Sequence, residues 1–236
     1  MAPTSFQGFP KEAFTFLKEI KTHNNKTWFE KHKEAYVENV VEPGQALVEA
    51  LGPRLQKVAK TVQYDSSASG HGSVKRIYRD VRFSKDKKPY KDYFGLIFWD
   101  GKGSKKEVPS FGLHVEQDGG WFFAGMHGFP TKEVRETYRK MVDNERTGKE
   151  LQRIVHGIRK TRGYEVGGSE LKNVPREFDP EHPRGELLKH NGLWALSPKI
   201  TVAQLKSPKL VSQCAAYAKK TAPLEQWLVK LWKKAS

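Results

Sequence analysis

The residue types most suited to chemistry are concentrated between Lys75 and Lys91, where eight side chains are basic and two are acidic. Three arginines recur there at three-residue spacing. A guanidinium stays charged at cellular pH, and its planar fork suits bidentate binding of a phosphate or a carboxylate. The segment therefore predicts a site for a phosphorylated or otherwise anionic small molecule. The residues expected to bind it are Arg76, Arg79, Arg82, Ser84, Lys85, Lys88 and Lys91.

The backbone of this segment decides which of these side chains can meet. On extended backbone, Arg76 and Arg82 face the side opposite to Arg79, whereas on a helical turn all three lie nearly in line. Asp80 could hold one arginine in position. Lys172 could reach the same anion from a second loop, because binding residues concentrate on loops.

The same charges also allow a structural interpretation. Ion pairs Arg79–Asp80 and Lys85–Asp86 would clamp a loop, and the remaining lysines would be solvated. The Arg–Asp motif would then be architectural, and the chain would act as a structural or protein-interaction domain.

Aromatic residues within the segment suggest a further alternative. Tyr78, Phe83 and Tyr90 alternate with the basic residues. They could stack on bases while the cations contact phosphates, as in single-strand-binding proteins. A basic nucleic-acid-binding module is therefore the alternative to a small-molecule site.

Catalytic chemistry is weakly indicated. Asp80 and Tyr90 are the first candidates for proton transfer, but no sequence feature fixes either role, a reaction or a cofactor. His114 and Glu116 share a strand face, which a solvent-facing side of a sheet explains without chemistry. The eight histidines and the single cysteine show no metal-ligand spacing, so we expect no metal.

Helices and a sheet must position the segment. Apolar residues at helical spacing predict helices over about 11–20 and 26–41, with Pro43 and Pro53 dividing the stretch that follows. Strands over 93–99, 111–116 and 121–124 predict an antiparallel meander, the first strand being covered on both faces.

Later helices are predicted after Thr131, at a capping box that begins at Thr147, after Ser207 and beyond Pro223, with a strand near 193–196. We therefore expect an α+β fold, with a mainly antiparallel sheet within about 92–127 plus one or two other strands. Helices at both termini would pack on this sheet.

Composition bounds the remaining possibilities. The 236 residues carry a formal net charge of +15, which favours anionic partners, and their length suits a single domain over 1–236. One cysteine rules out an intrachain disulfide, and we expect Cys214 in the core. No apolar run reaches the length of a membrane span and no signal peptide is evident, so we expect a cytoplasmic protein without a membrane partner.

Three blocks of sequence carry a family resemblance: Asn24 to Phe29, Arg76 to Lys91, and Leu171 to Pro175. Together they resemble the conserved hypothetical family known as domain of unknown function 2461, over about residues 8–233. The resemblance implies a shared fold and a shared site. It implies no reaction, substrate or cofactor.

Overall fold

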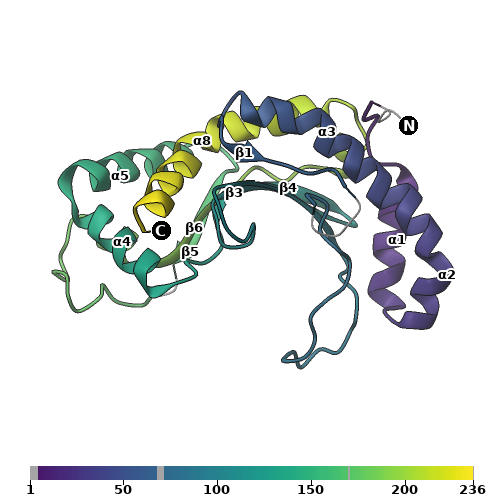
Figure 1. The fold of residues 1–236 in the computed structure, drawn as a ribbon, viewed down its shortest axis with the longest axis horizontal. Helices are drawn as coiled ribbons and strands as arrows, with labels where there is room; N and C mark the ends of the chain where they lie inside the picture. The colour runs from purple at the N-terminus through teal and green to yellow at the C-terminus, as the bar shows by residue number, and fades with distance from the viewer. Residues whose placement is uncertain (1–4, 68–71, 170, 236) are drawn as a thin grey trace.

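The computed structural model describes residues 5–67, 72–169 and 171–235, and Figure 1 shows their arrangement. Six strands form one sheet in the order β1-β2-β3-β4-β6-β5, and all neighbouring strands are antiparallel. The strands are β1 Val62–Gln63, β2 Phe94–Asp100, β3 Ser110–Glu116, β4 Gly119–Met126, β5 Glu165–Ser169 and β6 His190–Leu196.

Helices precede and follow the sheet, so the α+β class with helices at both termini is confirmed. In Figure 1 the long helices α3 and α8 lie over one face of the sheet, α1 and α2 lie at one end, and α4 and α5 lie at the other. The helices are α1 Lys11–Thr22, α2 Lys26–Tyr36, α3 Glu42–Gln56, α4 Lys132–Asp143, α5 Glu145–Arg159, α6 Gly185–Leu188, α7 Val202–Leu205 and α8 Leu210–Ala235.

The prolines divide the helices less than predicted. A π-helical turn, Val37–Val41, joins α2 directly to α3, and the Glu42 N–H donates to the Val37 carbonyl. This wider turn changes the hydrogen-bond register just before Pro43, whose ring would clash with a carbonyl of a regular α-helix. Pro53 lies inside α3 without ending it. The expected division is therefore found at Pro43, which lies in the first turn of α3, and is wrong at Pro53.

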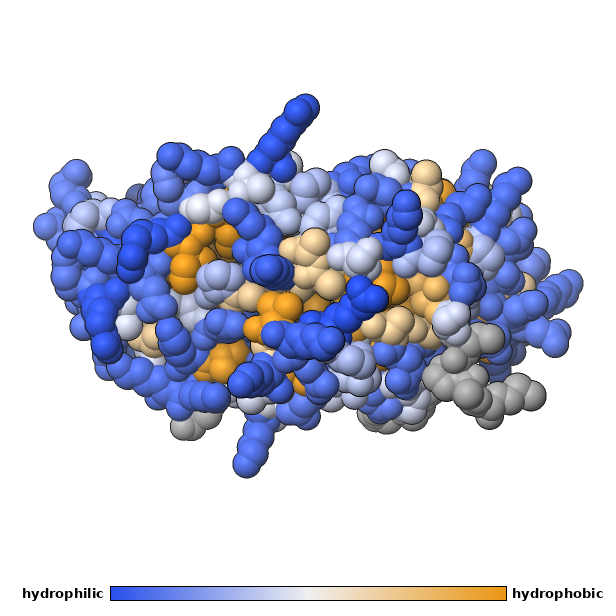
Figure 2. Space-filling model, turned by 90° about the horizontal axis from the view of Figure 1, so that it is seen from above, coloured by the Kyte–Doolittle hydropathy of each residue, from blue (hydrophilic) through white to orange (hydrophobic). Residues whose placement is uncertain are grey.

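The last helix corrects a similar expectation. α8 runs for 26 residues through Pro223, where two helices were predicted. Its first half packs on a core with α1, α3 and the sheet, and its second half packs on a separate core with α4 and α5. Cys214 is fully buried in the first of these cores. Figure 2 shows the outer side of the helical layer as hydrophilic around its periphery, with groups of hydrophobic residues along its middle.

The two faces of the central strands differ in their cover. Phe94, Leu96 and Phe98 of β2 belong to the core beneath the helices. The alternate residues Gly95 and Ile97 face the other way and line a cavity. The predicted meander is confirmed. Residues on both faces of β2 are buried, as predicted, with Ile97 only 5% exposed, but only one face lies beneath the helices.

One helix boundary and two strands were not predicted from the sequence. α5 begins after Asn144, whose side chain accepts from the Thr147 N–H, so the cap lies three residues before the predicted one. β5 lies in the glycine- and proline-rich stretch that follows Gly163, whose composition predicts irregular structure, and β1 has only two residues. The polar, serine- and glycine-rich composition of residues 64–72 predicts a loop, but 68–71 lie outside the described residues.

Candidate functional site

The uncovered face of the sheet is hollow because small residues meet near its centre. Gly112 lies between Ile97 and Phe123 in the strand register, and Ser110 lies opposite Gly125. Side chains of this face alternate with those of the helix-covered face. Small residues on neighbouring strands therefore leave a depression between larger side chains.

This depression is a cavity of about 280 Å³, which we call the open-face pocket. Its walls are mainly aromatic and apolar, and the glycines form part of its floor. Site prediction missed it, although glycines alternating with large residues in β2, β3 and β4 were visible in the sequence. The principal wall residues are Tyr93, Ile97, His114, Trp121, Phe123 and His127.

His114 lies in the wall between two aromatic rings. Its ring centroid is 4.4 Å from that of Tyr93 and 5.6 Å from that of Trp121. Its Nε2 lies 3.0 Å from a Glu116 carboxylate oxygen, so the two residues do share a strand face. A carboxylate that orients an imidazole is a common arrangement for moving a proton. The pair is partly exposed, and this weakens its electrostatic coupling.

Lys75 brings a cation to the pocket. A Cβ atom at position 95 would lie 3.3 Å from the Lys75 Cδ, so the glycine leaves space for the lysine stem against the sheet. The Lys91 Nζ donates to the Arg76 carbonyl at 2.5 Å and lies 6.0 Å from the Tyr93 ring centroid. The base of the basic segment therefore adjoins the pocket.

Further cations come from the loop between β2 and β3. Desolvation lowers the pKa of Lys75, and the charges of Lys106 and Lys105 lower it further. Although Lys75 is exposed as a whole residue, desolvation is the main cause of its lowered pKa. Desolvation also lowers the pKa of Lys91, followed by the charges of Lys75, Lys106 and Arg76. These five residues form what we call the cationic rim: Lys75, Arg76, Lys91, Lys105 and Lys106.

The rest of the basic segment is an arm, residues 76–91, which projects from the body on the side away from α3 and α8 (Figure 1). Its two limbs are joined by the backbone: the Arg79 N–H donates to the Pro89 carbonyl and the Lys91 N–H to the Ile77 carbonyl, both at 2.8 Å. An isolated bridge pairs Tyr78 with Tyr90. The arm is therefore a hairpin-like structure with few regular strand residues.

Two arginines of the arm bind carboxylates of the arm itself. Arg79 donates to Asp86 at 2.6 Å and to the Lys88 carbonyl at 3.2 Å. Arg82 donates to both oxygens of Asp80, at 3.0 and 2.7 Å, and its hydrogen bonds lower the pKa of Asp80 to about 2.

A structural network was one of the interpretations of the basic segment, but the ion pairs expected for it are wrong. Arg79 pairs with Asp86 and not with Asp80, because the bend of the arm brings the two limbs together. The Asp80 carboxylate instead accepts from the Arg82 backbone N–H within its own turn, and Arg82 is its ion-pair partner. Lys85 is not the partner of Asp86.

Asn24 clamps the base of the arm. Its side-chain amide donates to the Tyr90 carbonyl and accepts from the Tyr90 N–H, both at 3.0 Å. The Tyr90 ring is buried and stacks on Phe29 with centroids 4.3 Å apart. The next residue, Asn25, caps α2 by accepting from the Trp28 N–H. Burial is the main cause of the raised pKa of Tyr90, and its packed ring has an ordering role.

The predicted anion-binding residues are spread over the arm. Arg76 and Lys91 belong to the cationic rim. Lys91 also lines a neighbouring cavity of about 320 Å³ beside Asn24, together with Arg79 and Lys88. Arg82, Ser84 and Lys85 lie in the outer part of the arm between these limbs.

Lys172 lies elsewhere. The neighbouring Leu171 N–H donates to the Lys189 carbonyl, which places Lys172 beside α6. Figure 1 shows this loop at the α4–α5 end of the molecule, away from the arm. The structure therefore does not bring Lys172 together with the other predicted residues.

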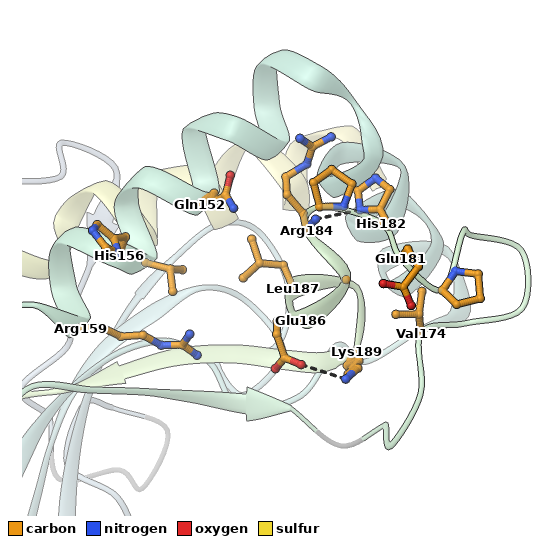
Figure 3. Close-up of a pocket in the computed structure, with 14 residues that line it drawn as sticks. Gln152, His156, Arg159, Val174, Glu181, His182, Arg184, Glu186, Leu187 and Lys189 are labelled. Atoms are coloured by element: carbon orange, nitrogen blue, oxygen red, sulfur yellow. Dashed lines mark hydrogen bonds and ion pairs between the residues drawn. The ribbon is translucent and has the colours of Figure 1, made fainter.

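A third cavity, of about 440 Å³, lies between α5 and the loop that leads into α6 (Figure 3). Several of the charged side chains that line it already bind other groups of the protein. The buried Arg184 donates to the Val142 and Asp143 carbonyls, and Lys189 binds Glu186 at 2.9 Å. Figure 3 shows His156 and Arg159 on one helix across the cavity from this pair. This lining holds the loop in place, so we base no function on it.

Neither a metal-ligand cluster nor a membrane-spanning helix occurs in the described ranges. Within 5–67, 72–169 and 171–235, no three His, Cys, Asp or Glu side chains gather in a way that could hold a metal ion. None of the helices found there combines the length and apolar character needed to cross a membrane.

The chain matches one known protein family over most of its length. A family model described as conserved hypothetical protein, DUF2461, matches residues 12–227. The matched range contains all six strands, the Asn24 clamp, the arm and the open-face pocket. No curated protein matches the chain.

Proposed function

Because the chain belongs to the DUF2461 family of conserved hypothetical proteins, whose description names no reaction, we propose its function from geometry. It binds a small anionic molecule that has a flat apolar part. The open-face pocket holds the flat part, and the cationic rim binds a phosphate or carboxylate at its edge.

The observation that carries this proposal is the meeting of an aromatic hollow with several cations. Lys75, Arg76 and Lys91 form no ion pair with a carboxylate of the described residues. Desolvation is the main cause of the lowered pKa of Lys75 and of Lys91, and repulsion from neighbouring cations lowers both further: from Lys106 and Lys105 for Lys75, and from Lys75, Lys106 and Arg76 for Lys91. An anion at the rim would relieve this repulsion.

The pocket limits the size and shape of its ligand. Pockets for drug-sized molecules typically occupy about 300–1,000 Å³. At about 280 Å³, the open-face pocket suits one ring system. The side chains of Tyr93, Trp121 and Phe123 offer ring faces and edges for stacking.

The proposal changes the roles of two predicted anion ligands. Arg79 and Arg82 already bind Asp86 and Asp80, so we assign them to the shape of the arm. Arg76 and Lys91 remain in contact with the ligand, joined by Lys75, Lys105 and Lys106.

A thermal-shift screen followed by calorimetry tests this proposal. Planar phosphates and carboxylates, including mononucleotides, should stabilise the wild type, and the bound class should lose most of its effect with Trp121→Ala or Lys75→Met. Lys233→Met changes the same charge at an exposed site on α8 and should respond as the wild type does. The proposal fails if no compound stabilises the wild type, or if all four proteins respond equally.

A further inference from the structure

We propose that the arm extends the open-face pocket into a binding path for single-stranded nucleic acid. This inference rests on the proposed function, because one nucleotide unit would supply the flat group and the anion at the pocket. Neighbouring phosphates and bases would then follow the arm outward.

The first observation is an exposed aromatic side chain in the outer part of the arm. Phe83 is 95% exposed, and Tyr78, nearer the base, is 51% exposed. The Arg82 guanidinium carbon lies 5.8 Å from the centroid of the Phe83 ring. A ring beside a guanidinium is a stacking platform for a base, and such stacking tolerates any sequence because every base has a π-face.

The second observation is an excess of positive charge along the arm. It contains seven basic and two acidic residues, and both acidic side chains already bind arginines of the arm. Lys85 and Lys88 are exposed, and their ammonium groups form no ion pair within the described residues. Lys87 uses one donor on the Val81 carbonyl at 3.1 Å and remains exposed. These lysines provide contacts for phosphates between the pocket and Phe83.

The third observation is that the arm is held in shape before any ligand arrives. Ion pairs fix its limbs, and the Asn24 clamp fixes its base. A preorganised surface loses less conformational entropy on binding than a loop that must become ordered. The exposed Phe83 is therefore presented by a defined structure.

A polymeric ligand explains why both the open-face pocket and the outer part of the arm carry features suited to binding. The outer part of the arm projects away from the sheet, so one small molecule in the pocket would not contact Phe83 (Figure 1). An anionic membrane would contact the end of the arm and leave the recessed rim and pocket unused. A single-stranded nucleic acid has regularly spaced charges and flat bases, so it would contact the end of the arm, the cationic rim and the open-face pocket together.

Fluorescence anisotropy with a labelled single-stranded oligonucleotide of about ten nucleotides tests the inference, since such binding sites span about 4–16 nucleotides. The same proteins are titrated with the matching mononucleotide by calorimetry. The arm variants are Phe83→Ala and the double variant Lys85→Ala/Lys88→Ala. The control Lys233→Ala/Lys234→Ala makes the same charge change at exposed sites of α8, and unfolding curves verify that each variant is folded.

We expect each arm variant to weaken oligonucleotide binding by about tenfold and leave mononucleotide affinity within about twofold. The control should keep its oligonucleotide affinity. Wild-type affinity should fall with salt between about 50 and 200 mM, less steeply for the lysine variant.

Three results would overturn the inference: no oligonucleotide binding, equal losses in the arm and control variants, or arm-dependent binding to phosphatidylserine vesicles without oligonucleotide binding. Failure of the proposed pocket is recognised separately. In that case Trp121→Ala leaves the affinities for the mononucleotide and the oligonucleotide unchanged, while the arm variants still weaken oligonucleotide binding.

Discussion

The two faces of the sheet are made from alternate residues of the same strands, and β4 shows the contrast within three positions. Phe122 is buried in the core beneath the helices, where its ring centroid is 6.0 Å from that of Phe111. Its neighbours Trp121 and Phe123 point to the uncovered face and line the open-face pocket. Three consecutive aromatic residues thus divide between a core and a candidate binding surface.

This comparison separates stability from binding. On the covered face, apolar side chains meet helices and exclude water, which is the main source of folding free energy. On the open face, aromatic rings surround glycines and leave a hollow, so their surfaces remain available to a ligand. Substitutions on the two faces should therefore affect different measurements.

The largest expected effect is on the covered face. Phe122→Ala removes a buried ring and leaves a cavity, which should lower the free energy of unfolding by about 3–5 kcal/mol. Urea denaturation followed by tryptophan fluorescence measures this change. A loss below about 1 kcal/mol would mean that the two faces contribute similarly to stability.

A buried carboxyl pair sharpens the comparison, because it interrupts the apolar layer where α8 passes from one core to the other. Burial, then the nearby charge of Asp100, then a hydrogen bond to it, raises the pKa of Glu225 to about 9. No donor from the described residues reaches either Glu225 oxygen, so a protonated Glu225 can donate to the Asp100 carboxylate.

Since its folded pKa is raised, protonated Glu225 contributes stability that is fully present below about pH 4.5 and is lost as pH rises towards 9. Glu225→Gln should remove this loss. Between about pH 5 and 8, the free energy of unfolding of the variant should therefore rise relative to that of the wild type by up to about 1.4 kcal/mol per pH unit. Urea denaturation at several pH values measures the difference, and parallel pH profiles would contradict the assignment.

An intermediate effect is expected at the base of the arm. Asn24→Ala removes both hydrogen bonds to the Tyr90 backbone and should lower the free energy of unfolding by about 1–2 kcal/mol. Asn24→Asp keeps the acceptor for the Tyr90 N–H and should cost less. Hydrogen exchange should report faster exchange of the arm amides, and unchanged exchange would show that Asn24 does not hold the arm.

The smallest stability effect is expected on the open face. Trp121→Ala should lower the free energy of unfolding by about 1 kcal/mol or less, because the ring is only half-buried, but it should weaken ligand binding strongly. Unfolding curves and the calorimetric titration measure the two quantities on one sample. A loss as large as that of Phe122→Ala would break the division between the faces.

Local patterns were sufficient for much of the fold. Helical spacing of apolar residues predicts α1, and the residues over 111–124 predict two strands and their turn, because these features depend on neighbours in sequence. Pro223 misled the prediction because packing on two cores keeps α8 continuous through it. Tertiary contacts can outweigh the local preference of a proline.

The sequence by itself determined the family resemblance, the α+β class and the concentration of charge between Lys75 and Lys91. Only the tertiary structure decided how those charges are used. Asp86 lies seven residues from Arg79, and Asn24 lies 66 residues from Tyr90, yet both pairs are in hydrogen-bond contact. The open-face pocket likewise depends on the register of separate strands, which alone brings Gly112 beside Phe123. Such contacts arise from chain folding between distant residues, so periodicity and composition do not contain them.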